Sequence, residues 1–303
     1  MLAQTFKSDS CSAVFGTIGT LDQALWDIKA KAAGEPLWRL LGAHDHVVPG
    51  YASGLCAGLD DEELFALYQE FADHGFSTAK IKGGRDLTAD LRRLDIVRDA
   101  LGVAHPGLAL DANESWNPTQ AVRYVSRLEE QHDLAWVEEP VRRWDAAGLA
   151  RVGHGVRAAV ASGENLTGLD QFAPLLLARS VDLVQTSSGW GLTHFLRVAA
   201  FAHALDRPVS PVGSFHQLAA AAAAVPNHTL TEVQSFALPS GLSGDWTVEA
   251  GRIVLGAQPG NGLSLDEAAL APLAARGPWA PHVRPVRAGW SLSLHPGRES
   301  EPR

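Results

Sequence analysis

The feature that most constrains this 303-residue chain is a strand-like segment followed by a helix-like segment, repeated along most of its length. The predicted strands are residues 47–53, 78–82, 108–111, 135–138, 158–163, 181–185, 208–212 and 230–234. The helices predicted between them are 60–75, 87–101, 118–131, 146–152, 169–179, 192–204 and 217–225. A doubly wound open sheet seldom repeats this unit so evenly. We therefore expect the α/β class and a closed TIM-like (β/α)7β barrel.

Composition and charge exclude several classes of protein. The chain has 34 Asp and Glu residues against 25 Lys and Arg, a formal net charge of −9, and 46% hydrophobic residues. This balance predicts a globular protein with a sizeable core and opposes nucleic-acid binding, which relies on clustered Lys and Arg. The two cysteines, Cys11 and Cys56, have no metal-binding spacing, and no phosphate-binding loop or GxSxG motif occurs in a strand-turn-helix setting.

Membrane association and secretion are also not expected. The longest run of small apolar residues, 218–225, is far shorter than the roughly 20 residues that a membrane span requires. Residues 1–12 lack the continuous apolar stretch of a secretion signal. We therefore expect a cytoplasmic protein with no membrane partner.

Acidic residues recur at the expected ends of three successive strands. Asp111, Glu138 and Glu164 follow Lys82 at intervals of 26 to 29 residues, each about one strand-helix unit. In a barrel these carboxylates would meet at the carboxyl ends of the strands, where active sites of this fold lie. Three oxygen ligands suit Mg²⁺. A single Asp or Glu after a strand more often caps the next helix, but three in step favour a metal site.

A pair of lysines lies one unit before the first of these carboxylates. Lys80 and Lys82 are two residues apart on a strand, so both side chains project to the same side, into the barrel. Two ammonium groups close to each other and to a divalent cation disfavour each other's charge. A lysine whose pKa is lowered in this way can act as a base near neutral pH.

At this point the sequence resembles the enolase superfamily, and most closely its mandelate racemase branch. The resemblance runs from about residue 20 to 265. The stretches that carry it are Ala24-Leu25-Trp26-Asp27-Ile28-Lys29, Lys80-Ile81-Lys82, Asp111-Ala112-Asn113, Trp136-Val137-Glu138-Glu139-Pro140 and Gly163-Glu164-Asn165.

The resemblance implies a role for each matching residue. Asp111, Glu138 and Glu164 would ligate one Mg²⁺ per subunit, with Mn²⁺ as a possible substitute. Lys82 would remove the proton α to a substrate carboxylate, and Lys80 would hydrogen-bond that carboxylate. A protonated Glu232, at the end of the last strand, would donate a hydrogen bond to the same group. Three further residues are expected beside the metal or the substrate: Asn113, Glu139 and Asn165.

The chain departs from this family at the sixth and seventh strands. The mandelate racemase branch has an Asp at the end of the sixth strand and a His at the end of the seventh, which together form a second base. Here the sixth reads Gln185-Thr186-Ser187-Ser188, and Val212 occupies the position of the histidine. His216 lies four residues later and is a candidate for reaching the pocket, although a histidine near a helix start is more often structural.

This departure discriminates among reactions. Racemisation needs acid/base groups on both faces of the planar intermediate, whereas elimination of a β-hydroxyl can proceed with one. We therefore expect a carbon-oxygen lyase that dehydrates a sugar acid or other hydroxy-acid through an enediolate. The alternatives are a racemase, epimerase or cycloisomerase of the same superfamily and, from another class, a catalytically inactive enolase-like scaffold or binding subunit.

The resemblance also predicts the domain organisation. Residues 1–46 would be a helical remnant of an N-terminal α+β cap domain, either because the gene model is truncated or because the pocket is unusually open. Residues 47–240 would form the barrel, 241–276 a hairpin and a helix packing back toward the cap, and 277–303 a flexible tail. The expected partners are a small carboxylate substrate and further copies of the chain in a homo-oligomer.

Overall fold

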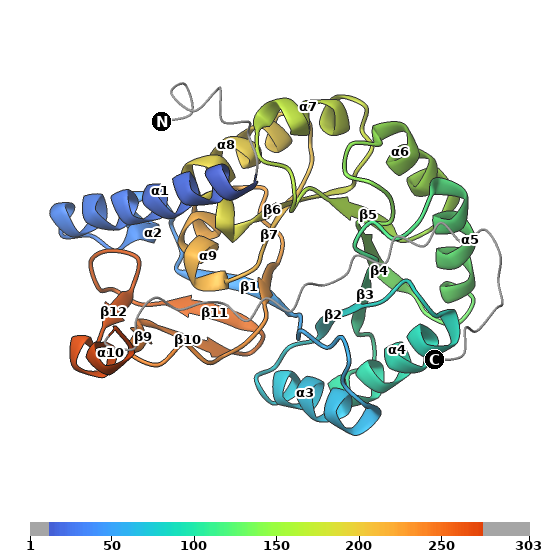
Figure 1. Cartoon of the computed structure of the whole chain (residues 1–303), viewed down its shortest axis with the longest axis horizontal. Coiled ribbons are helices and arrows are strands. Elements are labelled where there is room, and N and C mark those ends of the chain that lie inside the picture. The colour runs from blue at the N-terminus through green and yellow to red at the C-terminus, as the bar shows by residue number, and fades with distance from the viewer. Residues whose placement is uncertain (1–11, 275–303) are drawn as a thin grey trace, which may run out of the picture.

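The computed structural model describes residues 12–274 and shows a ring of parallel strands surrounded by helices (Figure 1). Each of the eight predicted strands is present, with ends shifted by a few residues at most. They are β1 (Val47–Ala52), β2 (Thr78–Lys82), β3 (Gly107–Asp111), β4 (Leu134–Glu138), β5 (Ala159–Ser162), β6 (Leu183–Ser187), β7 (Val209–Val212) and β8 (Thr231–Val233).

Seven helices follow the first seven strands and cover the outside of the ring. They are α3 (Asp61–Asp73), α4 (Leu87–Leu101), α5 (Pro118–Leu128), α6 (Ala146–Gly155), α7 (Leu169–Leu177), α8 (Leu192–His203) and α9 (Phe215–Ala224). Short polar side chains fix where several of them begin. Asp60 and Asn117 each form a reciprocal capping box, with Glu63 and Gln120 respectively, which satisfies backbone N–H groups that the first helical turn leaves free.

The strands pair in the order expected for a barrel, except at one seam. β1 pairs in parallel with both β2 and β8, and β2 to β7 pair in sequence order. Within the described chain, β7 and β8 share no ladder. Residues of β7 instead contact the segment just before β8: Val209 forms an isolated bridge with His228, and Ser210 Oγ donates to the Leu230 carbonyl at 2.7 Å. Pro211 lies in β7 and has no N–H to donate. The expected closure of the barrel is therefore incomplete at this seam.

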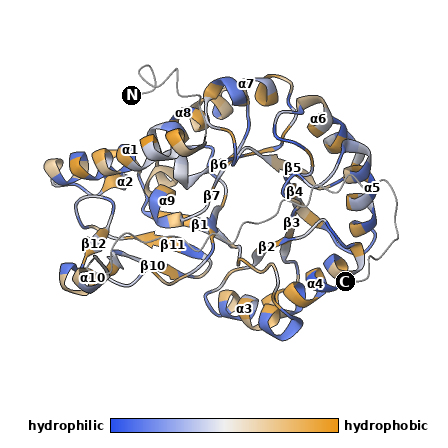
Figure 2. Ribbon diagram, viewed as in Figure 1, coloured by the Kyte–Doolittle hydropathy of each residue, from blue (hydrophilic) through white to orange (hydrophobic). Residues whose placement is uncertain are grey.

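Alternation along the strands separates two apolar regions. Tyr51, Ala109, Trp136 and Ala161 form a small cluster, with the rings of Tyr51 and Trp136 packed edge to face at 5.0 Å. Ala109 and Trp136 have the same strand parity as Asp111 and Glu138, so this cluster lies inside the ring. A much larger core packs strand residues such as Ile81 against the buried faces of the helices. Figure 2 shows that these helices carry both hydrophobic and hydrophilic residues.

The segment before the barrel consists of two helices. It forms α1 (Ser12–Ala33) and the short α2 (Leu37–Leu40), separated at Gly34, whose φ of 69° ends α1. Leu21, Leu25 and Ile28 share one face of α1 and are each about half exposed. No helix in residues 12–274 is both long and apolar enough to cross a membrane.

The segment after the barrel packs against β1 and α2. The hairpin of β10 (Trp246–Glu249) and β11 (Arg252–Leu255) extends the sheet antiparallel to the start of β1. A second pair, β9 (Leu242–Gly244) with β12 (Leu263–Leu265), was not anticipated, and α10 (Glu267–Ala274) follows. Trp38 Nε1 donates to the Gly256 carbonyl at 2.8 Å. The expected domain boundaries stay a prediction, and the expected tail, 277–303, lies outside the described residues.

Candidate active site

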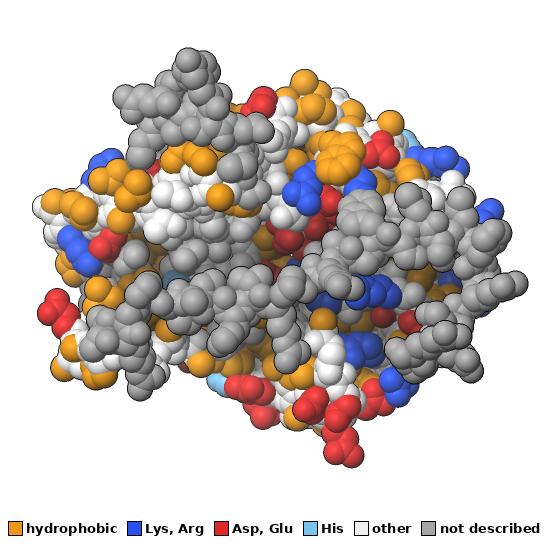
Figure 3. Space-filling view, viewed as in Figure 1, with side chains coloured by type: hydrophobic (Ala, Val, Ile, Leu, Met, Phe, Trp, Pro, Cys, Tyr) orange, Lys and Arg blue, Asp and Glu red, His pale blue; other side chains and the backbone are white. Residues whose placement is uncertain are grey.

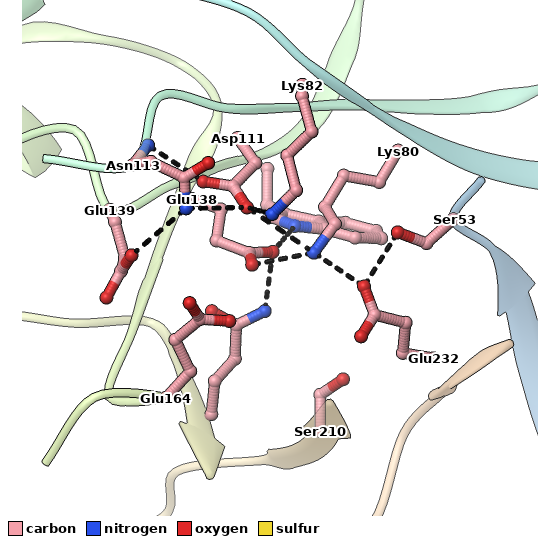
Figure 4. A network of polar contacts seen from close by, with 12 residues as sticks. Ser53, Lys80, Lys82, Asp111, Asn113, Glu138, Glu139, Glu164, Ser210 and Glu232 are labelled. Carbon is pink, nitrogen blue, oxygen red and sulfur yellow. Dashed lines mark hydrogen bonds and ion pairs between the residues drawn. The ribbon is translucent and has the colours of Figure 1, made fainter. Parts of the chain in front are cut away.

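Six charged side chains from five strands gather at the carboxyl ends of the strands (Figure 4). The strand register brings them level, because Lys82 pairs with Asp111 and Asp111 pairs with Glu138. Acidic side chains are also visible near the centre of the face shown in Figure 3. The cluster contains Lys80, Lys82, Asp111, Glu138, Glu164 and Glu232, all of which the sequence predicts as site residues.

Lys80 lies at the centre of the cluster and is fully buried. Its Nζ is 2.6 Å from Glu138 Oε1, 2.9 Å from Glu232 Oε1 and 3.7 Å from Asp111 Oδ2. Burial alone would lower the pKa of Lys80, but the surrounding carboxylates raise it well above its ordinary value. In this arrangement carboxylates outnumber the two ammonium groups, and the lowering of a lysine pKa that is expected beside a divalent cation stays a prediction.

Lys82 lies nearer the opening of the site and pairs with Asp111. Burial and the neighbouring Lys80 lower the pKa of Lys82, but Asp111 and Glu138 outweigh them and the net shift is upward. Asp111 also accepts a hydrogen bond of 2.9 Å from the backbone N–H of Asn113. Burial would raise the pKa of Asp111, but the two lysines lower it overall.

Glu138 is held from two sides by residues that sequence reasoning missed. Gln185 Nε2 donates to Glu138 Oε2 at 2.7 Å, and Trp136 Nε1 donates to the same oxygen at 3.2 Å. This leaves Oε1 facing Lys80. Burial, together with repulsion from Asp111, Glu164 and Glu232, raises the pKa of Glu138 to about 8 in spite of Lys80. The inward parity of Trp136 and Gln185 on their strands is the signal that could have identified them.

Glu232 lies 2.9 Å from Lys80 Nζ, and its surroundings favour the ionised form over the protonated form that the resemblance implies. Ser53 Oγ donates to Glu232 Oε1 at 2.6 Å, and Gln234 Nε2 donates to Oε2 at 3.0 Å. The backbone N–H of Gly213 also donates to Oε2. Burial would raise the pKa of Glu232, but Lys80 and these donors lower it overall.

Glu164 follows β5 through a sharp turn at Gly163, whose φ is 130°. A Cβ at Gly163 would lie 2.3 Å from the Gln185 carbonyl oxygen, so only glycine allows β5 and β6 to approach this closely. Asn165 Nδ2 donates to Glu164 Oε1 at 3.1 Å and to Glu139 Oε1 at 2.9 Å. Burial and the neighbouring carboxylates raise the pKa of Glu164 and bring that of Glu139 to about 7.

The remaining face of the site has no titratable side chain at the strand ends. β6 ends in Thr186 and Ser187, and β7 ends in Val212. The structure does not bring His216 to the cluster. Its ring instead stacks on Trp246 of β10, with centroids 5.7 Å apart and planes within 4° of parallel.

The donor chemistry of the cluster fits a divalent cation. Asp111, Glu138 and Glu164 supply three carboxylates from consecutive strand ends, and their mutual repulsion, seen in the raised pKa values of Glu138 and Glu164, is what a cation would relieve. Among the described residues, however, no three such side chains are already arranged around one point as metal ligands. In the present arrangement Lys80 and Lys82 contact the oxygens of Glu138 and Asp111 instead.

This fold and cluster define a class of proteins: parallel α/β barrels with a lysine and carboxylate site at the carboxyl ends of the strands. The chain belongs to the enolase superfamily, in its mandelate racemase and muconate lactonizing enzyme group. Residues 63–269 match the model described as "Enolase C-terminal domain-like". Residues 3–42 match the model of the mandelate racemase / muconate lactonizing enzyme N-terminal domain. The predicted family and barrel fold are thereby confirmed.

Curated relatives include sugar-acid enzymes. The chain is 36% identical over 252 residues to the 3,6-anhydro-α-L-galactonate cycloisomerase of Streptomyces coelicolor, covering 82% of this chain and 69% of that protein. It is 36% identical over 198 residues to the L-talarate/galactarate dehydratase of Salmonella typhimurium, covering 64% of this chain and 49% of that one. The chain thus spans between half and about two thirds of the length of these relatives.

Similar solved structures contain magnesium. A racemase from Streptomyces coelicolor with bound magnesium has a TM-score of 0.83 and 33% identity, covering 90% of this chain and 76% of that one. L-Talarate dehydratase from Polaromonas sp. JS666, in complex with Mg and L-glucarate, has a TM-score of 0.76 and 29% identity, covering 85% and 69%.

Proposed function

We propose that this chain carries out Mg²⁺-dependent removal of the proton α to a carboxylate, followed by loss of a β-oxygen, and that its substrate is a sugar acid or related hydroxy-acid. The observation that carries the proposal is the one-sided chemistry of the site. Lys82 is a candidate base on one face, whereas Ser187 and Val212 end the strands on the other. Elimination needs only one acid/base group, but racemisation needs two.

The ion would be held by Asp111, Glu138 and Glu164. It would take the place of Lys80 and Lys82, which contact Glu138 and Asp111 in the present arrangement. Bound there, it would supply a positive charge that stabilises the enediolate oxygens. Asn113 and Asn165 orient these carboxylates by the hydrogen bonds described above. Mn²⁺ prefers similar oxygen ligands and should substitute.

The chain's own residues would move the proton. Lys82 in its neutral form takes the α-proton, so its pair with Asp111 must be exchanged first. The electron pair of the broken C–H bond becomes part of the enediolate. This electron pair then forms the Cα=Cβ bond as the bond from Cβ to its hydroxyl breaks. The proton returns from Lys82 to the departing hydroxide, which leaves as water, and the enol product becomes a 2-keto acid. Lys80 lies where it can orient the substrate carboxylate, and Glu232 holds the Lys80 ammonium group in place.

A cycloisomerase is the second candidate, favoured by the cycloisomerase relative that covers 82% of the chain. The same proton transfer at a sugar acid whose β-oxygen belongs to a ring would open that ring instead of releasing water. Mass spectrometry separates the two candidates, because the dehydration product is one water lighter than the substrate and the ring-opened product is its isomer.

The test is incubation with a panel of sugar acids and Mg²⁺ while formation of 2-keto acid is followed. We expect a 2-keto product from at least one acid, and a Lys82→Ala rate lower by about 10²–10⁴-fold, the usual contribution of a general base. The absence of any 2-keto product, with α-deuterium exchange and scrambled stereochemistry, would instead establish a racemase. The absence of both reactions would favour an inactive scaffold.

A further inference from the structure

Three non-glycine residues beside the carboxylate cluster have left-handed backbone conformations. Asn113 has a φ of 42° and Glu114 a φ of 59°, directly after β3, and Glu139 has a φ of 41°, directly after β4. A residue held in this region costs of order 1–3 kcal/mol, so it persists only where its surroundings hold it. Because these residues adjoin Asp111 and Glu138, whatever holds them also positions those two carboxylates.

One side chain, that of Arg143, joins the loops that follow β3, β4 and β5. Arg143 lies in the loop after β4, and its Nε donates to Glu114 Oε1, in the loop after β3, at 2.6 Å. Its backbone N–H donates to the same oxygen at 3.0 Å. Its Nη1 donates to the carbonyl of Asn165, in the loop after β5, at 3.3 Å. Glu114 is only 6% exposed and its own N–H donates to the Glu139 carbonyl at 2.7 Å.

The charge of Arg143 also matters at this place. Burial lowers the pKa of Arg143, but the acidic side chains of Glu114, Glu139 and Glu164 outweigh it and the net shift is upward. Arg142 lies 3.6 Å from the other oxygen of Glu114. If Arg143 were removed, Glu114 would keep one weaker cationic partner, and the link between the loops after β3 and β5 would be lost.

We propose that Arg143 is a positioning residue that holds the loops after β3, β4 and β5 in the geometry that Asp111, Glu138 and Glu164 need to bind one divalent cation. The inference rests on the proposed function, which names those three residues as the ligands. Arg143 does not touch them directly. It acts through Glu114 on the strained backbone after β3 and β4, and through Asn165, whose side chain bonds Glu164.

The test is Mg²⁺ titration of the full chain by calorimetry, with the melting temperature measured in chelator and in Mg²⁺. We expect Arg143→Met to weaken Mg²⁺ affinity by 10- to 100-fold, as is usual when a residue supporting metal ligands is lost. The matched control is Arg123→Met, which removes an exposed arginine of α5 and should leave the affinity unchanged. Arg143→Lys should recover only part of the loss, because one ammonium cannot replace a fork that reaches both Glu114 and Asn165.

Each result has a distinct meaning. If Arg143→Met melts earlier in chelator but gains the same stabilisation from Mg²⁺ as the wild type, its role is structural only and the inference is overturned. Full recovery by Arg143→Lys would likewise overturn it in favour of charge alone. If Arg143→Met does not fold, Glu114→Gln, which weakens the same link from its other end, should lower Mg²⁺ affinity in its place. A wild-type chain that binds no divalent cation would overturn the proposed function and this inference with it.

Discussion

At the residue scale, one buried ammonium group, that of Lys80, organises the polar site. Lys80 is the only side chain in the described cluster that contacts Glu138, Glu232 and Asp111 together. Breaking a buried ion pair from one side leaves an uncompensated charge and costs about 3–5 kcal/mol. We therefore expect Lys80→Met to lower the free energy of unfolding by about that amount in chelator, measured by urea denaturation at neutral pH.

Two controls define this prediction. Lys31→Met breaks an exposed pair with Asp27 on α1, which should cost at most about 1 kcal/mol. The double variant Lys80→Met/Glu138→Gln removes one of the carboxylates that Lys80→Met leaves without a partner. It should recover part of the lost free energy of unfolding. A Lys80→Met variant as stable as the wild type would show that Lys80 does not hold the three carboxylates together.

At the scale of the elements, a buried aspartate ties α4 to the loop that follows Lys82. Asp90 of α4 accepts hydrogen bonds from the Gly84 N–H at 2.6 Å and from Tyr124 Oη of α5 at 2.8 Å. Trp116, in the loop after β3, donates its Nε1 to the Gly84 carbonyl at 2.8 Å. This network therefore connects two helices with the loops that follow Lys82 and Asp111.

We expect Asp90→Asn to lower the free energy of unfolding by about 1–3 kcal/mol, because a neutral amide oxygen accepts these two hydrogen bonds more weakly than a charged carboxylate does. The loop should also open more often, so hydrogen exchange at Gly84 should become faster. Asp95→Asn, an exposed change on the same helix, is the control. Unchanged exchange at Gly84 in Asp90→Asn would show that the loop is held by other contacts.

The sequence could predict which elements form and where the charged strand ends meet, because both follow from spacing and alternation. Strand parity placed Lys80 and Lys82 inside the barrel, and spacing by about one strand-helix unit placed Asp111 and Glu138 at the strand ends. The sequence could not predict which oxygen faces which ammonium group, nor that the surrounding carboxylates raise the pKa of both lysines in this arrangement. Gln185 and Ser53 were missed because inward parity marks a candidate residue but does not say which side chain across the ring it will bond. The placement of His216 depended on Trp246, from a hairpin remote in the sequence.

At the scale of the whole molecule, the first helix is docked on the barrel through contacts around His194. Asp22 of α1 accepts a hydrogen bond of 2.8 Å from the Thr193 N–H, and Gln23 Nε2 donates to the Ser188 carbonyl at 2.7 Å. The ring of His194 packs against Phe15 of α1 at a centroid distance of 5.2 Å. Protonation of this buried histidine would place a charge between α1 and the barrel.

The pH dependence of stability should report this contact. Burial lowers the pKa of His194 to about 4, whereas an unfolded histidine titrates near 6.5. Between these values the unfolded chain binds the extra proton, so stability is full above about pH 6.5 and falls as the pH drops toward 4. The His194 share of the free energy of unfolding that is lost between pH 7 and pH 5 is about 2 kcal/mol.

Urea denaturation at these two pH values tests this share. Because His194→Gln cannot titrate, its free energy of unfolding should fall by about 2 kcal/mol less than that of the wild type. His203→Gln, an exposed change near the end of the same helix, should lose as much as the wild type. Equal losses in the wild type and His194→Gln would mean that acid acts on the molecule elsewhere.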